Sequence, residues 1–98
     1  IAHKRGILVN EYLETNMLDI YSAGDCAEFH TAFPYRKNIE QVWYTGKIQA
    51  EALAKTICGN KTAYNPGIWF NSAKFFDIEY QTYGLVDFKT QNEKNLYW

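Results

Sequence analysis

An α+β fold is predicted from three features of this 98-residue sequence. The first is a stretch from 38 to 58 in which apolar or small residues recur every three or four positions, as on one face of a helix. The second is a pair of short runs ahead of it, Ile7-Leu8-Val9 and Ile20-Tyr21-Ser22-Ala23, each suited to a short strand. The third is a series of β-rich runs behind it, near 67–71, 74–82, 84–89 and 95–98. We therefore expect one long helix followed by an aromatic-rich antiparallel β meander.

The composition is that of a globular protein with a modest core. Apolar residues make up 47% of the chain, aromatic residues 17% and charged residues 21%, which excludes a disordered segment. Ten basic and eleven acidic residues are interspersed, so no basic stripe suits a nucleic acid. No run approaches the ~20 apolar residues of a membrane span and no signal peptide is visible, so we expect a cytoplasmic protein without a membrane partner.

Groups that perform acid–base or metal chemistry are sparse. His3 and His30 are isolated, and Cys26 and Cys58 form no Cys-x-x-Cys pair. No residue stands out as a general acid, a general base or a nucleophile. The sequence therefore predicts no catalytic residue and no metal ligand.

A Gly-Asp step, Gly24 and Asp25, directly follows the run at 20–23. Gly24 has no side chain, so a ligand or another backbone segment can come close there. Asp25 is then expected at the carboxyl end of a buried strand, where open α/β sheets place their ligands. An ionised carboxylate only accepts hydrogen bonds, and a pair of polyol hydroxyls suits it well. Because Gly-Asp is also a common turn dipeptide, the residues alone leave open a ligand-binding carboxylate and a simple turn cap.

The expected helix has recognisable ends. Asn38 is a suitable N-cap with Gln41 three residues later, as in a capping box, and Gly59 is placed to end the helix. The amides of Gln41, Val42 and Trp43 are then expected at the helix N-terminus, whose partial positive charge suits an electron-rich or anionic ring.

The expected helix face carries small residues in its middle. Gly46 and Ala50 leave a shallow side, open either to a flat ligand or simply to tight packing. Just before the helix, Arg36 and Lys37 are expected to be solvated rather than to bind an anion. The apolar face is predicted to consist of Ile39, Val42, Trp43, Gly46, Ala50, Leu53, Ala54 and Ile57.

Aromatic residues concentrate behind the helix, with ten of the seventeen between Tyr64 and Trp98. Three interpretations stay open: an ordinary core, a sugar-binding aromatic face, and an interface. An unpaired, aromatic-rich sheet edge favours pairing with a second chain.

Several motifs stand in a fixed order along the chain: Gly6-Ile7-Leu8-Val9-Asn10, Thr15, Asp19-Ile20-Tyr21-Ser22-Ala23-Gly24-Asp25 and Trp43-x-x-Gly46-x-x-Gln49-Ala50. Together they resemble the last part of the FAD domain in FAD/NAD(P)-dependent pyridine-nucleotide oxidoreductases, above all the rubredoxin-reductase and ferredoxin-reductase branch. The segment 69–84 resembles the start of that family's C-terminal interface domain. The resemblance thus implies the end of an FAD-binding α/β domain at 1–60 and the start of an interface domain at 61–98.

The resemblance also implies roles for individual residues. In the family, the aspartate of the Gly-Asp block binds the ribityl chain of the flavin, a role that maps onto Asp25 with the Cys26 backbone amide beside it. The helix start faces the N1/O2 edge of the flavin, and this position maps onto Val42 and Trp43. The family's glutamate normally stands two residues before the tryptophan, where this chain has Gln41, so no carboxylate is assigned there. The expected cofactor-binding residues are Gly24, Asp25, Cys26, Val42 and Trp43.

The implied function is that of a flavin-dependent oxidoreductase that moves electrons from NAD(P)H through FAD to an electron carrier or a small acceptor. An electron-carrier protein and a second copy of the chain are the implied partners. The family's Gly-x-Gly-x-x-Gly nucleotide fingerprint does not occur in the sequence, so we expect a C-terminal fragment that is inactive alone and binds little flavin. The alternative is a noncatalytic, aromatic-rich binding or assembly domain.

Overall fold

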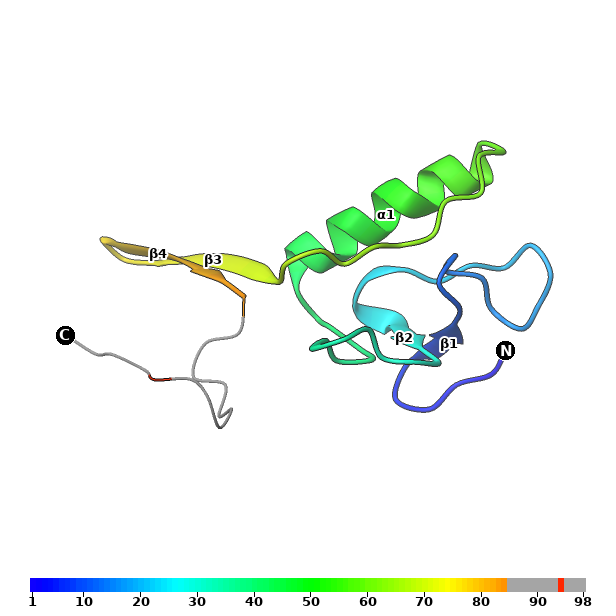
Figure 1. Cartoon of the computed structure of the whole chain (residues 1–98), viewed down its shortest axis with the longest axis horizontal. Coiled ribbons are helices and arrows are strands. Elements are labelled where there is room, and N and C mark those ends of the chain that lie inside the picture. Colours follow the sequence, from blue (N-terminus) through cyan, green and yellow to red (C-terminus); the bar gives the residue numbers. More distant parts are fainter. Residues whose placement is uncertain (85–93, 95–98) are drawn as a thin grey trace. The chain divides into compact units, whose positions relative to one another are not determined.

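The computed structural model describes residues 1–84 and 94, and it confirms the α+β class (Figure 1). The described chain divides into two compact units, Ile1–Gly67 and a second that begins at Ile68. The expected β-runs beyond Gly84, at 84–89 and 95–98, lie outside the described residues. In chain order the elements are β1 (Ile7–Val9), the 3₁₀ turn η1 (Gly24–Cys26), β2 (Ala27–Phe29), α1 (Trp43–Ile57), β3 (Phe70–Phe75) and β4 (Ile78–Tyr83).

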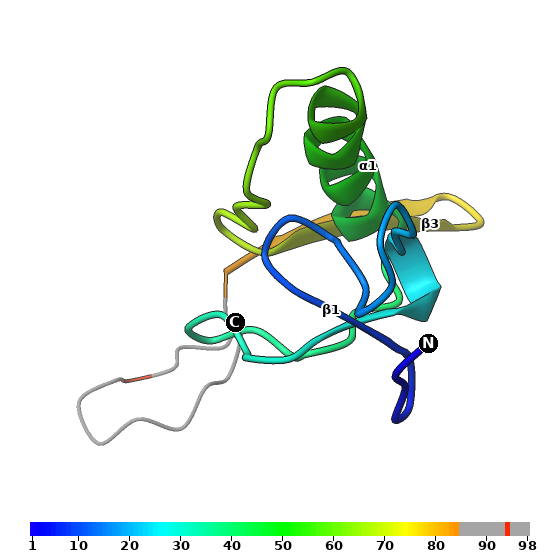
Figure 2. The same ribbon diagram turned by 90° about the vertical axis from the view of Figure 1, so that its right-hand side faces the viewer.

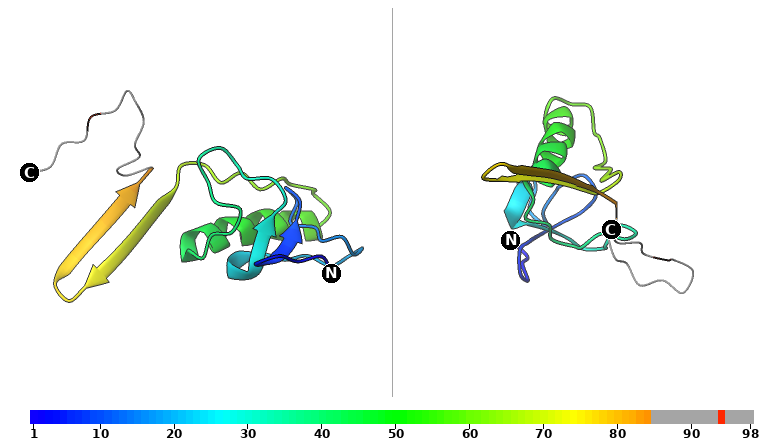
Figure 3. Two further views of the ribbon diagram at one scale, coloured as in Figure 1. Left: turned by 90° about the horizontal axis from the view of Figure 1, so that it is seen from below. Right: turned by 90° about the vertical axis from the view of Figure 1, so that its left-hand side faces the viewer.

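Strands β1 and β2 form a parallel pair in which Leu8 lies opposite Glu28 (Figure 3, left). The expected strand at 7–9 is confirmed. The expected strand at 20–23 is wrong, because this segment forms only a single antiparallel bridge, between Tyr21 and Glu14, that closes a loop. Thr15 N donates to Ile20 O at 3.0 Å and Ser22 N donates to Leu13 O at 3.1 Å. The second strand lies instead after the Gly-Asp step. Its three residues are all buried. Because the middle one is Glu28, the sequence shows no apolar pattern that would predict this strand.

Glu28 is buried because backbone groups satisfy its charge. Its Oε2 atom accepts hydrogen bonds from Arg5 N and Gly6 N, both at 2.9 Å. These bonds, led by the one from Gly6, hold the pKa of Glu28 below its usual value against the opposing effect of burial. The carboxylate thus fastens the turn before β1 to strand β2.

Helix α1 begins at Trp43, later than the sequence predicts, with Val42 as its N-cap and no side-chain capping bond. Asn38 is not the cap, because it pairs with Phe29: its carbonyl accepts from Phe29 N at 2.8 Å and its Nδ2 donates to Phe29 O at 3.0 Å. The predicted helix end is confirmed. Gly59 has φ +90°, its amide donates to Thr56 O, and the next amide donates to Lys55 O, which together form a Schellman stop.

The buried face of α1 is only partly the predicted apolar one. Its buried residues are Thr45, Gln49 and Ala52. Of the predicted face, Leu53 packs against the core and Gly46 lies against Gly24. Trp43 and Ile57, by contrast, expose 70% and 63% of their surface. No helix in the described part of the chain is long and apolar enough to cross a membrane.

The core of the first unit lies between α1 and the strand pair, with α1 running along one side of the unit (Figure 2). Phe29 stacks on Tyr64 with ring centroids 5.2 Å apart, and Phe33 meets both rings edge-on. The buried core residues are Val9, Leu13, Ala27, Phe29, Ala52 and Tyr64.

The second unit contains an antiparallel hairpin of β3 and β4, in which Phe70 lies opposite Tyr83 and Phe75 opposite Ile78. This confirms an antiparallel arrangement, although the single run expected at 74–82 is interrupted by a turn at Phe76 and Asp77. Phe76 adopts φ +53° at the tip and is 95% exposed. The tip of the hairpin thus presents aromatic residues to solvent.

Candidate cofactor-binding site

The Gly-Asp step lies in η1, at the amino end of β2 rather than at the carboxyl end of a strand. The sequence-based placement of Asp25 at the end of a strand is therefore wrong, although its side chain faces solvent as expected. Cys26 is also exposed. Gly24 has φ +76°, which favours glycine, and a Cβ built there would meet nothing within 4 Å. None of the described residues hydrogen-bonds the Asp25 carboxylate, so its acceptor sites remain available to a ligand.

The turn rests directly on helix α1. The Gly24 amide donates to Gln49 Oε1 at 2.7 Å, and a Cβ built on Gly46 would lie 3.4 Å from Gly24 Cα. Packing against η1 thus accounts for the glycine in the middle of the helix. Behind the turn, Ser22 Oγ and Cys26 Sγ lie 3.4 Å apart.

The helix start lies one turn from this contact. Gly46 N donates to Val42 O at 3.0 Å as the first bond of the helix ladder, so the N-terminal amides are those of residues 43–45 rather than those of 41–43. Trp43 lies beside this start, with its ring edge-on to Tyr44 and Lys47 Nζ 5.9 Å from its centre. The structure therefore brings four of the expected residues, Gly24, Asp25, Val42 and Trp43, to the region where η1 meets the first turns of α1.

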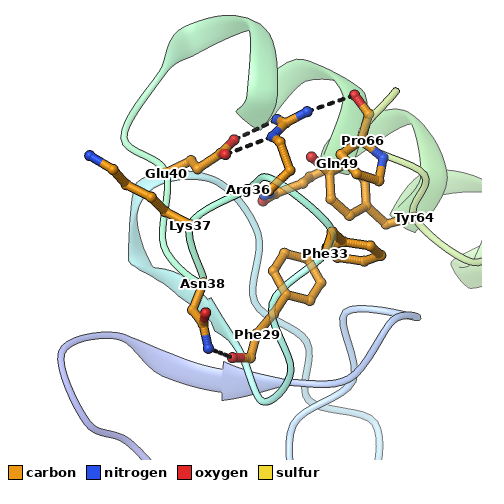
Figure 4. A pocket seen from close by; sticks show the side chains of 9 residues that line it. All are labelled: Phe29, Phe33, Arg36, Lys37, Asn38, Glu40, Gln49, Tyr64 and Pro66. Carbon is orange, nitrogen blue, oxygen red and sulfur yellow. Dashed lines mark hydrogen bonds and ion pairs between the residues drawn. The ribbon is translucent and has the colours of Figure 1, made fainter. Parts of the chain in front are cut away.

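A buried ion pair, which the sequence did not reveal, lies next to the helix start (Figure 4). Arg36 Nε donates to Glu40 Oε1 at 2.7 Å and Arg36 Nη2 donates to Glu40 Oε2 at 2.5 Å, while the two side chains expose only 7% and 10% of their surface. Glu40 Oε2 also accepts from Thr45 Oγ1 in the first helical turn, at 3.0 Å. The expectation that Arg36 is solvated is wrong, whereas Lys37 is exposed as expected.

Arg36 also donates hydrogen bonds to the last two residues of the first unit. Its Nη1 donates to the carbonyl oxygens of Pro66 at 3.0 Å and Gly67 at 3.2 Å. The only sequence signal for this role is the four-residue spacing from Arg36 to Glu40, and because the segment is not helical that spacing predicts no contact.

Tyr64 lies beside this network, in the pocket that Gln49 and Arg36 also line (Figure 4). Burial is the main cause that raises the pKa of its hydroxyl. Burial also opposes ionisation of Glu40, but the hydrogen bonds and charge of Arg36 prevail and keep the pKa of Glu40 below its usual value. Within residues 1–84 and 94, no buried side-chain nitrogen or oxygen lacks a hydrogen-bond partner.

The surface of the first unit has two hollows away from the ion pair. One of about 220 Å³ lies beyond the carboxyl ends of β1 and β2, beside Asn10, His30 and Phe33. The other, of about 380 Å³, lies along the loop 14–21. The described residues include no group of three or more His, Cys, Asp or Glu side chains that is able to hold a metal ion.

Comparisons with known proteins identify relatives over part of their length. No protein-family model matches the chain. It is 52% identical over 59 residues to the rubredoxin-NAD(+) reductase of Acinetobacter baylyi, a match that covers 59% of this chain and 13% of that protein. It is 42% identical over 65 residues to the NADH-rubredoxin oxidoreductase of Clostridium acetobutylicum, covering 66% of this chain and 16% of that protein.

A solved structure agrees with these relatives. The crystal structure of NADH:rubredoxin oxidoreductase from Clostridium acetobutylicum matches with a TM-score of 0.56 and 35% identity, over 74% of this chain and 20% of that one. The chain thus spans a fifth or less of the length of each of these proteins.

Proposed function

The chain is homologous to a segment of the rubredoxin and ferredoxin reductases, and from this premise we propose that it supplies part of the flavin site of an NAD(P)H-dependent oxidoreductase. In this proposal electrons pass from NAD(P)H through FAD to an electron carrier, with a rubredoxin-type protein as the first candidate, or to a small acceptor. The observation that carries the proposal is the meeting of the Gly24–Asp25 turn with the start of α1.

The residues at this junction fit a flavin. An exposed carboxylate without a hydrogen-bond partner among the described residues is available at Asp25 to accept bonds from polyol hydroxyls. Gly24 adds no side chain to obstruct a ligand, and no neighbouring atom fills the space that a Cβ would enter. A bound flavin would supply the hydride and electron chemistry, whereas the protein's part is to bind and orient it.

The helix start contributes charge stabilisation. Val42 caps α1 without a side-chain bond, and the first amides of an α-helix have no acceptor within the helix. The partial positive charge there stabilises negative charge on a nearby ring by about 0.3–1 kcal/mol at an exposed site. Trp43, which is exposed beside this start, offers a flat apolar surface to the same ligand.

The test is the visible absorption spectrum of the purified complete polypeptide that carries these residues, as wild type and as Asp25→Ala. We expect a flavin band in the wild type that is weakened or lost in Asp25→Ala. Glu51→Ala, which removes an exposed carboxylate from α1, serves as the matched control and should keep the band. A colourless wild type that takes up no added FAD would remove the oxidoreductase proposal.

Self-association belongs to the same proposal. Four large apolar side chains gather near the tip of the hairpin, and each is at least 44% exposed: Phe75, Phe76, Ile78 and Tyr80. Such a surface favours pairing with a second copy of the chain. A monomeric elution volume at high protein concentration would contradict homodimer formation.

The exposed hairpin also supports a second candidate, a noncatalytic binding or assembly domain. In that case the protein would bind an oligosaccharide or a protein partner equally well with Asp25 replaced, provided that the segment around Trp69 is intact. A partner lost with Asp25→Ala but not with Phe76→Ser would argue against it.

A further inference from the structure

The buried polar groups beneath the Gly24–Asp25 turn form one connected set. Gln49 Oε1 accepts from the Gly24 amide at 2.7 Å, and Thr45, one turn earlier on the same face of α1, donates from Oγ1 to Glu40 Oε2 at 3.0 Å. Glu40 forms the two-bond pair with Arg36, and Arg36, Gln49 and Tyr64 line one pocket (Figure 4). The set, which we call the clamp, consists of Arg36, Glu40, Thr45, Gln49 and Tyr64.

The clamp joins the two parts of the proposed flavin site, the Gly24–Asp25 turn and the first turn of α1. At one end Gln49 fixes the backbone amide of Gly24, the residue immediately before Asp25. At the other end Glu40 accepts from the Thr45 hydroxyl, in the first turn of α1. The helical residue at each end is buried, with Gln49 2% and Thr45 4% exposed, so each bond is shielded from water on the helix side.

We propose that Gln49 and Arg36 are positioning residues for the flavin: the clamp sets the distance and orientation of the Asp25 carboxylate relative to the start of α1. This inference rests on the proposed function. Gln49 acts through Gly24 and Arg36 acts through Glu40 and Thr45, so neither side chain itself touches the ligand.

The geometry explains why a glutamine stands on the buried face of the helix. Its amide oxygen accepts the half-buried Gly24 amide, and a side chain of similar shape without that oxygen leaves this donor without its protein acceptor and the turn free to shift. A ligand held between two elements is sensitive to such a shift, since displacements of about 1 Å weaken both binding and charge stabilisation.

The test compares Gln49→Met with wild type in the complete polypeptide. Methionine keeps the length of the side chain and removes its hydrogen-bonding groups. We expect FAD to be retained about tenfold more weakly, the reduction potential of the remaining bound flavin to become more negative, and Gly24 amide exchange to accelerate. Lys55→Met, an equally long replacement at an exposed position in the last turn of the same helix, should leave all three unchanged.

A second variant covers the case in which Gln49→Met does not fold. Tyr64→Phe removes only the hydroxyl of a side chain that lines the same pocket as Gln49 and Arg36, and we expect about threefold weaker FAD retention with the potential shifted in the same direction. Wild-type retention and potential in the folded variants would overturn the clamp.

The two proposals fail in different ways. If Asp25→Ala loses the flavin and Gln49→Met keeps it with an unchanged potential, the clamp is overturned and the proposed function stands. If the wild type binds no flavin, both proposals fall, even if Gly24 exchange responds to Gln49→Met.

Discussion

The two faces of helix α1 differ in burial in a way that the polarity of their residues does not predict. The face that carries Trp43, Ala50, Ala54 and Ile57 is exposed, whereas the face with Thr45, Gln49 and Ala52 is buried. The buried polar side chains are tolerated because each has partners: Thr45 bonds Glu40 and Gln49 bonds Gly24. The contrast shows that burial along α1 follows the hydrogen-bond partners available beside it rather than hydrophobic periodicity alone.

The largest effect is expected from breaking the ion pair next to the buried face. Arg36→Met leaves the Glu40 carboxylate buried without its partner, which costs about 3 kcal/mol of unfolding free energy. Urea denaturation measures this loss. The double variant Arg36→Met with Glu40→Leu should recover much of it, and a double variant as unstable as the single one would contradict a buried pair.

Removing the buried amide should have the next largest effect. Gln49→Met leaves the Gly24 amide without an acceptor and is expected to cost about 2 kcal/mol. The same denaturation experiment on Lys47→Met should show a change below about 0.5 kcal/mol, since that side chain is exposed. Equal losses in both variants would remove the distinction between the two faces.

Acid should weaken the buried face selectively. The folded-state pKa of Glu40 lies below its ordinary value of 4.5, so its contribution to stability is complete above about pH 4.5 and is lost as pH falls through the folded pKa. The stability difference between wild type and Glu40→Gln should therefore shrink below that pH. Comparing the two proteins at each pH cancels the similar titration of Glu14 and Glu28. A difference that stays constant from pH 7 to pH 3 would contradict a charged pair.

The smallest effect is expected on the exposed face. Ile57 is 63% exposed in the last turn of α1, and Ile57→Lys should change the unfolding free energy by no more than about 0.5 kcal/mol. Thermal unfolding followed by circular dichroism is sufficient for this comparison. A loss comparable to that of Gln49→Met would show that this face is covered.

Local patterns in the sequence predict the fold class, the strand at 7–9, the end of the helix and the antiparallel arrangement of the strands that follow it, although not the position of the hairpin turn. The Gly59 stop depends on residues within one turn of the chain, so it is visible from sequence. Asn38 shows the opposite case: it is a suitable capping residue by type, but its side chain instead hydrogen-bonds Phe29, nine positions away. The strand at 27–29 escapes prediction because Glu28 in its centre is satisfied by amides at positions 5 and 6.

In the candidate site, too, some residues are predictable from the sequence and others are not. Asp25, Gly24 and the start of the helix follow from motif resemblance, and the structure brings them to one junction. Arg36 reads as a solvated base because its partners are carbonyls 30 and 31 residues later and a carboxylate in a nonhelical segment. Contacts set by tertiary packing between such distant positions leave no periodic signal.

The first measurement is amide hydrogen exchange at Gly24 in the 98-residue chain. It reports on the hydrogen bond from Gly24 to Gln49, which joins the turn to the buried face of α1. Exchange is followed by NMR in the wild type, in Gln49→Met and in Lys47→Met. We predict a protected Gly24 amide in the wild type and in Lys47→Met, with exchange at least about tenfold faster in Gln49→Met, as the loss of more than about 1.4 kcal/mol from a local hydrogen bond requires. An unprotected Gly24 amide in the wild type, or unchanged protection in Gln49→Met, would contradict the account.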